Sequence, residues 1–223
     1  MRIVILLLGL ALPSAALAID QSYQTWTSVA VHKALSENWA LYFDANGRFY
    51  HDFDTAQVLL RPGVMRKLND QFSLYLAYAW TPAWSDDDAD MTDEHRIWQQ
   101  LTWNSGGKLS LFSRSRLEQR FRPGNSSDVG VRFREFVRLL WRATEHFGIS
   151  LWDEVFIDLN HAENHDGRRW QRFGLDQNRV FAGPSFWLPA GVRIEVGYLN
   201  QYIDLTAPQQ MRHILALNGF VDF

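Results

Sequence analysis

The sequence contains no cysteine and only three lysines, at positions 33, 67 and 108, among its 223 residues. The absence of cysteine excludes a disulfide scaffold, a thiolate metal site and a cysteine nucleophile. The formal net charge is −3, and a chain without a basic excess is not expected to bind nucleic acid. The basic residues are almost all arginine, which is favoured where a cation sits in fixed contacts away from bulk water. The position of these arginines is therefore the main question that the sequence raises.

Long hydrophobic runs are also missing, except at the N-terminus. Arg2 precedes an apolar run over residues 3–12, and the small-residue site Ala16-Leu17-Ala18 follows. A short basic start, roughly ten apolar residues and an A-x-A site are typical of a secretory signal peptide. A membrane-anchoring helix needs about 20 apolar residues. We therefore predict that residues 1–18 are a signal peptide cleaved after Ala18, and that residues 19–223 are the mature, exported chain.

The mature chain alternates with a period of two. Within residues 109–122 the even positions carry five charged side chains and the odd positions carry none, and residues 131–142 repeat the pattern. Such alternation is typical of a strand and does not fit one face of a helix. Eleven segments have this character: 24–33, 39–50, 56–67, 71–81, 93–104, 109–121, 131–142, 147–159, 172–187, 192–202 and 212–223.

The lengths of these segments favour a membrane β-barrel over a soluble one. They suit the roughly 9–11 residues of a tilted membrane strand better than the roughly 5–6 of a globular strand. Short links alternate with long polar links, and the last strand ends in an aromatic residue, Phe223. Tryptophans recur near the strand ends, as in the aromatic girdles of outer-membrane barrels: Trp80, Trp84, Trp103, Trp141, Trp170 and Trp187. Periodicity alone leaves open a soluble barrel or sandwich with its apolar face inside.

Three segments resemble a known bacterial family. They are residues 114–121 (RSRLEQRF), 176–179 (DQNR) and 195–202 (EVGYLNQY). In these segments, and along essentially the whole mature chain, the sequence resembles the domain-of-unknown-function family DUF2490, which is grouped with outer-membrane β-barrels. The resemblance implies a single antiparallel barrel in the bacterial outer membrane. It implies no reaction, because the family has no assigned activity.

The charged parity of the strands is expected to line the lumen if the apolar parity meets lipid. The acids on this parity are Asp44, Glu94, Glu118, Glu154, Asp158 and Glu195. The arginines are Arg48, Arg61, Arg96, Arg114, Arg116, Arg120, Arg132, Arg134, Arg138, Arg179 and Arg193. The arginines outnumber the acids although the whole chain is acidic. A positive lumen in a low-dielectric wall attracts anions, so the first hypothesis is a narrow pathway for small anionic solutes.

Strand register supports a competing, non-conducting interpretation. Folding the hairpin about residues 105–107 places Glu94 opposite Glu118. Continued antiparallel pairing places Glu118 opposite Arg134, and Arg134 opposite Glu154. Directly opposite side chains lie about 5 Å apart, so these residues are expected to form an ionic row around the wall. Barrels of about eight strands are filled by side chains and open pores need about sixteen, so either a plugged structural barrel or a conducting one is possible here.

A lipid-modifying hydrolase is the third and least favoured hypothesis. On the lipid-facing parity, the register places Glu135 opposite Asp153 and places Ser115 diagonal to His95 and Glu135. These three are the residue types that a nucleophile, a base and an orienting group require. The G-x-S-x-G motif is absent, and a carboxylate facing lipid is unfavourable in itself. Ser115, His95 and Glu135 are therefore only weak catalytic candidates.

We assign no cofactor and no metal. The acidic run at residues 86–90 lacks the glycine of an EF-hand loop, and His161 and His165 fall in a predicted loop, where helical ligand spacing has no meaning. The expected partners are outer-membrane lipid, lipopolysaccharide and the barrel-assembly machinery, which would recognise the terminal strand ending in Phe223.

Bacterial barrels have even strand counts, so we expect ten strands, without residues 24–33, or twelve, with an extra one near residues 19–24.

Overall fold

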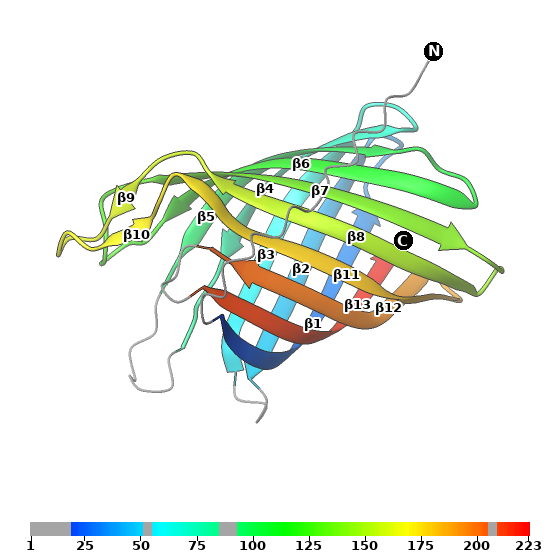
Figure 1. Cartoon of the computed structure of the whole chain (residues 1–223). Helices are drawn as coiled ribbons and strands as arrows, with labels where there is room; N and C mark the ends of the chain where they lie inside the picture. The colour runs from blue at the N-terminus through cyan, green and yellow to red at the C-terminus, as the bar shows by residue number, and fades with distance from the viewer. Residues whose placement is uncertain (1–18, 51–54, 85–92, 205–208) are drawn as a thin grey trace, which may run out of the picture.

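A computed structural model describes residues 19–50, 55–84, 93–204 and 209–223 (Figure 1). Eleven long strands form one closed barrel, and two short strands form a separate hairpin. Among the described residues, no helix is long and apolar enough to cross a membrane. The predicted all-β barrel is confirmed. The predicted signal peptide lies outside the described residues.

The barrel strands match the segments predicted from the period of two. They are β1 (Asp20–Ala34), β2 (Trp39–Tyr50), β3 (Thr55–Lys67), β4 (Phe72–Trp80), β5 (His95–Asn104), β6 (Leu109–Phe121), β7 (Gly130–Arg142), β8 (Phe147–Asp158), β11 (Gly174–Leu188), β12 (Val192–Ile203) and β13 (Gln210–Asp222). The separate hairpin consists of β9 (Ala162–Glu163) and β10 (Arg169–Gln171). It extends from one end of the barrel, between β8 and β11 (Figure 1).

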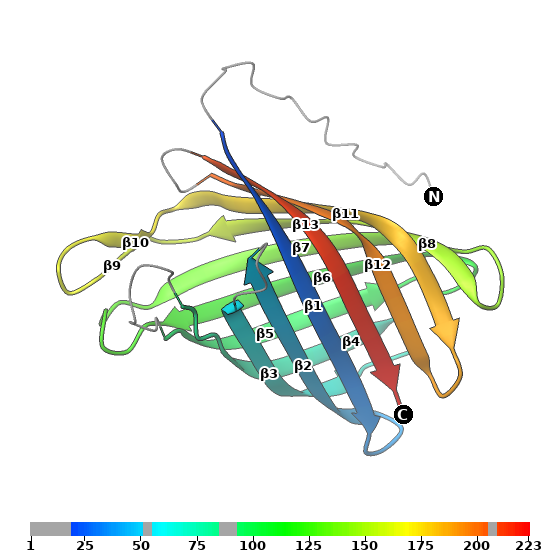
Figure 2. The same cartoon turned by 90° about the horizontal axis from the view of Figure 1, so that it is seen from below.

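A parallel pair, β1 with β13, closes the barrel (Figure 2). The register runs from Asp20 opposite Gln210 to His32 opposite Asp222. The predicted range of ten to twelve strands is confirmed, but neither even count is found. A ring in which all neighbours are antiparallel needs an even number of strands, whereas one parallel pair permits eleven. Residues 20–34 form one continuous strand, so the two alternatives considered for this region are both replaced.

Short and long connections alternate as predicted. Four-residue turns join β1 to β2, β3 to β4, β5 to β6 and β7 to β8 at one end, which we call the turn end. Gly106 and Gly107 have positive φ values of 66° and 89°, so the turn between β5 and β6 requires glycine there. The longer connections, including residues 122–129 and 159–173, lie at the opposite end, the loop end.

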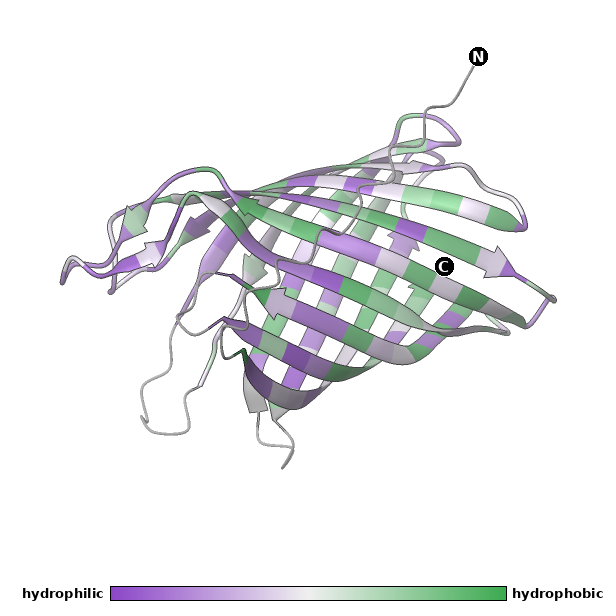
Figure 3. Ribbon diagram, in the orientation of Figure 1, coloured by the Kyte–Doolittle hydropathy of each residue, from purple (hydrophilic) through white to green (hydrophobic). Residues whose placement is uncertain are grey.

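Hydrophobic and hydrophilic residues alternate along the strands of the wall (Figure 3). The apolar side chains are exposed on the outer wall, and the charged side chains are buried inside the barrel. Leu139 and Leu151 on the outer wall are 42% and 47% exposed, whereas Glu118 inside is 1% exposed. A soluble barrel or sandwich has the opposite arrangement, so that alternative is excluded. Trp80 and Trp141 lie on the outer wall, as expected for girdle residues. Trp170 does not, because it belongs to β10 in the separate hairpin, where Arg122 lies 4.4 Å above its ring.

Candidate functional site

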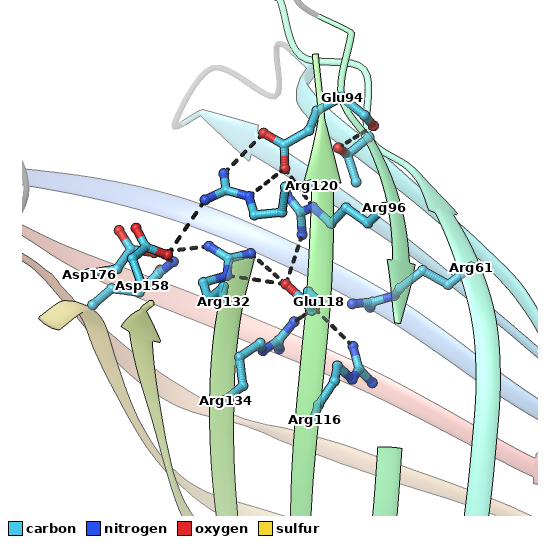
Figure 4. Close-up of polar contacts among 12 residues, drawn as sticks. Arg61, Glu94, Arg96, Arg116, Glu118, Arg120, Arg132, Arg134, Asp158 and Asp176 are labelled. Carbon is cyan, nitrogen blue, oxygen red and sulfur yellow. Dashed lines mark hydrogen bonds and ion pairs between the residues drawn. The ribbon is translucent and has the colours of Figure 1, made fainter. Parts of the chain in front are cut away.

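The loop half of the lumen contains a cluster of buried charges, which we call the ionic plug (Figure 4). Its members are Glu94, Arg96, Arg116, Glu118, Arg120, Arg122, Arg132, Arg134, Asp158 and Asp176. Glu118 lies at its centre. Arg134 Nη1 lies 2.6 Å and Arg132 Nη2 2.7 Å from its carboxylate oxygens, and Arg116 Nη1 lies at 3.5 Å. One carboxylate is therefore ion-paired with several guanidinium groups.

Glu94 holds the upper part of the ionic plug. It precedes β5 and lies outside the strands. Its carboxylate oxygens lie 2.7 Å from Arg96 Nε, 2.9 Å from Arg120 Nε and 3.0 Å from Arg122 Nε. Burial alone would raise the pKa of the Glu94 carboxyl, but the positive charges of Arg120, Arg96 and Arg122 outweigh this and hold the pKa well below its usual range. Glu94 is therefore an anion that links two strands and the loop after β6.

The segment after β8 closes the plug from the loop end. Gln171 of β10 is buried, accepts a hydrogen bond of 3.1 Å from Arg120 Nη1 and donates one of 2.7 Å to Asn160 Oδ1. A Cβ atom on Gly130 would lie 2.4 Å from Gln171 Oε1. Glycine at position 130 therefore allows the Gln171 side chain to enter the mouth of the barrel, and the mouth is filled by this chain's own loop.

The ionic plug is packed rather than water-filled. Arg116, Glu118, Arg132 and Arg134 are each less than 5% exposed. Removing one partner from a buried ion pair typically costs about 3–5 kcal/mol, although the intact pair contributes little net stability over an apolar core. The arrangement therefore fixes the geometry of the lumen at this level. Among the residues that the structure describes, it leaves no wide aqueous path at this level.

The turn half of the lumen contains a cavity of about 400 Å³, which we call the lumenal pocket. Its charged lining residues are Asp44, Arg48, Arg61, Arg114, Arg134, Arg138, Glu154, Arg179, Arg193, Glu195 and Asp222. Its aromatic lining residues are Trp26, Tyr42, Tyr75, Phe112, Phe136, Trp152 and Phe220. Arginines therefore outnumber carboxylates around a space that is large enough for a small molecule.

Two carboxylates in the lumenal pocket are each shared among arginines. Glu154 contacts Arg134 at 2.6 Å and Arg114 at 2.5 Å, and Arg179 lies 3.8 Å from it. Glu195 contacts Arg193, and Arg138 lies 3.7 Å from it. Five guanidinium groups thus share two carboxylates, and one of the five, Arg134, also contacts Glu118. By contrast, Arg61 and Asp44 form a simple pair, with Nε 2.7 Å from Oδ1.

Aromatic rings hold several of these guanidinium groups in place. Arg114 lies 4.4 Å above the Phe136 ring, Arg138 lies 5.0 Å above Phe112, and Arg193 lies 4.0 Å above Phe220. Such contacts stabilise a cation without neutralising it. The buried Nε atoms of Arg114, Arg138 and Arg179 have no hydrogen-bond partner among the described residues.

The seventeen residues that we assigned to the lumen all lie inside the barrel. Glu94, Arg96, Arg116, Glu118, Arg120, Arg132 and Asp158 lie in the ionic plug, and Arg134 belongs to both regions. The others line the lumenal pocket: Asp44, Arg48, Arg61, Arg114, Arg138, Glu154, Arg179, Arg193 and Glu195. Gln171, Asp176 and the aromatic lining were not among the residues predicted from the sequence. Phe112 and Phe136 could have been found, since they stand on the charged parity of their strands.

The predicted register is wrong by two to four residues. Glu118 stands opposite Trp98 and Arg132, rather than opposite Glu94 and Arg134. Arg134 stands opposite Phe156, rather than Glu154. Neighbouring strands of a tilted barrel are staggered, so β6 begins beyond the end of β5. The ionic contacts among Glu118, Arg134 and Glu154 still form, because arginine reaches its diagonal neighbours.

This register also separates the weak catalytic candidates. Ser115 donates a hydrogen bond of 2.5 Å to Glu135, which is the only part of the predicted triad found among the described residues. His95 stands opposite Phe121, six residues from Ser115 along β6, or roughly 20 Å. His95 instead contacts Asp93 at 3.0 Å and the Tyr78 hydroxyl. Within the described residues there is also no group of three or more His, Asp or Glu side chains arranged to hold a metal ion.

Comparisons with known proteins give one family and one informative structure. An uncharacterised protein of Methylorubrum extorquens is 36% identical over 178 residues, which cover 75% of this chain and 73% of that protein. The NanC porin structure matches with a TM-score of 0.50 and 11% identity, covering 81% of this chain and 86% of that one. LpxR from Salmonella typhimurium matches with a TM-score of 0.47 and 8% identity, covering 82% and 83%. The NanC likeness supports the barrel fold alone.

The family match extends over most of the described barrel. It covers residues 23–212, from the first strand to the last, and the family is described as "Protein of unknown function (DUF2490)". The resemblance identified from the segments around Arg116, Asn178 and Tyr198 is therefore confirmed. The chain belongs to the DUF2490 family, whose fold here is an outer-membrane-type β-barrel.

Proposed function

We propose that this protein is an outer-membrane barrel that admits small anionic solutes into an arginine-lined lumen. Residues 1–18 direct export, and the apolar outer wall with its exposed Trp80 and Trp141 meets lipid and lipopolysaccharide. The barrel-assembly machinery recognises β13 and the terminal Phe223. In the folded barrel the Phe223 N–H donates to the His32 carbonyl oxygen at 3.0 Å, so this strand is paired once β1 has docked.

The observation that carries this proposal is the sharing of Glu154 and Glu195 among five arginines. Unneutralised cations in a low-dielectric wall repel one another and attract mobile anions. The Nε atoms without partners, on Arg114, Arg138 and Arg179, supply fixed hydrogen-bond donors for such an anion. An anion in the lumenal pocket would therefore complete the charge balance that the chain leaves open.

A second candidate, a non-conducting structural or interaction barrel, is favoured by the ionic plug. The near-complete burial of Arg116 and Glu118 leaves little room for solute to pass the loop half. Both candidate functions include the lumenal pocket. They differ in whether a solute passes through the barrel. We therefore propose a slow, narrow pathway in which the plug must rearrange for each passage. Hydrolysis is not proposed, because His95 is remote from Ser115.

The test is conductance of the purified, refolded protein in a planar bilayer under a salt gradient. We expect a small conductance, with a reversal potential displaced toward the equilibrium potential of chloride. The control is Glu145→Gln, an exposed carboxylate in the turn between β7 and β8, which should behave as wild type. Complete absence of conductance would reject the pathway in favour of the structural barrel. A preference for cations would reject the positive lumen as well.

A further inference from the structure

The lumenal pocket contains two separate groups of arginines. The first group, Arg114, Arg134 and Arg179, surrounds Glu154. The second group, Arg138 and Arg193, surrounds Glu195. On β7, Arg138 is four residues closer to the turn end than Arg134, so the two groups lie at different depths in the lumen. A ligand that satisfied both groups would need an acid group at each level.

An aromatic surface lies between the two groups. On β8, Trp152 is two residues nearer the turn end than Glu154, and its ring stacks on Phe181 with centroids 5.1 Å apart and an interplanar angle of 12°. Phe136 lies beside it, with centroids 5.3 Å apart. Both Trp152 and Phe136 line the cavity. The Phe136 ring is tilted by 41° from the Trp152 ring. Because Phe181 supports the Trp152 ring from behind, the Trp152 ring itself is a rigid flat surface that suits a planar apolar body.

The donors on either side of this surface are buried and unused. The Nε atoms of Arg114 and Arg179 in the first group, and of Arg138 in the second, have no hydrogen-bond partner among the described residues. Arg179 is 8% exposed. A buried guanidinium donor without an acceptor is costly, and a carboxylate satisfies it with a charge-assisted hydrogen bond. Each group of arginines also carries more positive charge than its one carboxylate can neutralise.

We propose that the lumenal pocket binds an aromatic dianion, in which a flat ring carries an acid group at each end. One acid lies against Arg114 and Arg179, the ring lies against Trp152, and the second acid lies against Arg138. The cavity volume of about 400 Å³ is sufficient for one benzene dicarboxylate. This inference rests on the proposed function, since it names the class of anion that the positive lumen prefers.

The test compares ligands on the full-length mature protein in detergent, by titration calorimetry and by quenching of tryptophan fluorescence. The probes are benzene-1,4-dicarboxylate, benzoate and the aliphatic dicarboxylate adipate. We expect the aromatic dicarboxylate to bind at least about tenfold more tightly than benzoate, since each lost contact to a charged donor costs about 1.5 kcal/mol or more. We also expect it to bind more tightly than adipate, which has both acid groups but no ring to lie against Trp152. Equal binding of the dicarboxylate and benzoate would overturn the two-group site. Equal binding of adipate would overturn the aromatic surface.

Two variants locate the second acid. Arg138→Gln should reduce the affinity for benzene-1,4-dicarboxylate to about that of the wild type for benzoate. The matched control is Arg168→Gln, on an exposed loop arginine, which should change neither. Unchanged dicarboxylate binding in Arg138→Gln would overturn the assignment. If Arg138→Gln does not fold, Arg193→Gln in the same group serves instead. Binding of benzoate without any preference for the dianion would reject this inference alone, whereas no binding of any anion would also reject the proposed function.

Discussion

Arg134 donates a hydrogen bond of 2.6 Å to Glu118 through Nη1, and its Nη2 atom donates one of the same length to Glu154. Glu118 belongs to the ionic plug and Glu154 lines the lumenal pocket. One side chain therefore connects the closed half of the lumen to the hollow half. A change at Arg134 is expected to affect both regions.

Arg134→Gln should destabilise the barrel. The substitution leaves two buried carboxylates, Glu118 and Glu154, with fewer cationic partners, and removal of one partner from a buried pair costs about 3–5 kcal/mol. The measurement is the free energy of unfolding in urea, followed by heat-dependent gel migration. Arg168→Gln, at an exposed loop position, is the control and should unfold as wild type. Equal stability of the two variants would contradict the buried network.

Gly130→Val should expel Gln171 from the mouth of the barrel. A Cβ at this position would lie 2.4 Å from Gln171 Oε1 and 2.5 Å from the Trp170 ring, so the loop after β8 must move. We expect faster proteolysis within residues 159–173 while the barrel itself stays folded. Gly219→Ala is the control, because its Cβ would meet its nearest neighbour at an ordinary 3.6 Å. Equal proteolysis rates would show that the loop does not fill the mouth.

Stability should depend on the charge of Glu94 at low pH. Because Arg120, Arg96 and Arg122 outweigh burial and hold its pKa well below the usual value, the folded state binds its proton less readily than the unfolded chain. The stabilisation is present above the unfolded pKa of about 4.3 and is lost as pH falls through the lower folded pKa. The urea midpoint of wild type should fall steeply below about pH 4. In Glu94→Gln the midpoint should be lower at neutral pH and should fall less steeply.

The parallel closure can be tested by engineered disulfides, because the chain has no cysteine of its own. Thr25 of β1 stands opposite Leu215 of β13. The double variant Thr25→Cys with Leu215→Cys should cross-link on mild oxidation. Thr25→Cys with Val221→Cys, six residues along β13 and roughly 20 Å away, should not. Cross-linking of the second pair but not the first would contradict the observed register.

The fold was predictable because it depends on local pattern. The period of two, readable between Leu109 and Phe121, located all eleven barrel strands. Lumen-lining residues were predictable from the same local pattern, since arginines such as Arg116 and Arg134 stand on the charged parity of their strands. The parallel pairing of β1 with β13 was not predictable in this way. It depends on how the whole ring closes. The two strands are not joined by a turn, so no local sequence pattern indicates that they pair.

The details of the site depend on interactions that one strand cannot encode. Stagger between strands placed Glu118 beside Trp98 rather than Glu94, and a shift of this kind also moved His95 away from Ser115. The sharing of Glu154 among three arginines follows from the curvature of the wall and the reach of long side chains. Gln171 reaches the lumen from a loop without any periodic signal, and only the absence of a Cβ at Gly130 permits it.

The most direct test of the central claim compares the conductance of wild type and Glu118→Gln in the same bilayer. Glu118 is the central anion of the ionic plug, and its removal leaves Arg116, Arg132 and Arg134 with less neutralising charge. We expect wild type to conduct little, and Glu118→Gln to conduct more and to become more selective for anions. A wild-type barrel with large conductance, or a Glu118→Gln barrel that prefers cations, would contradict a positive lumen closed by buried ion pairs.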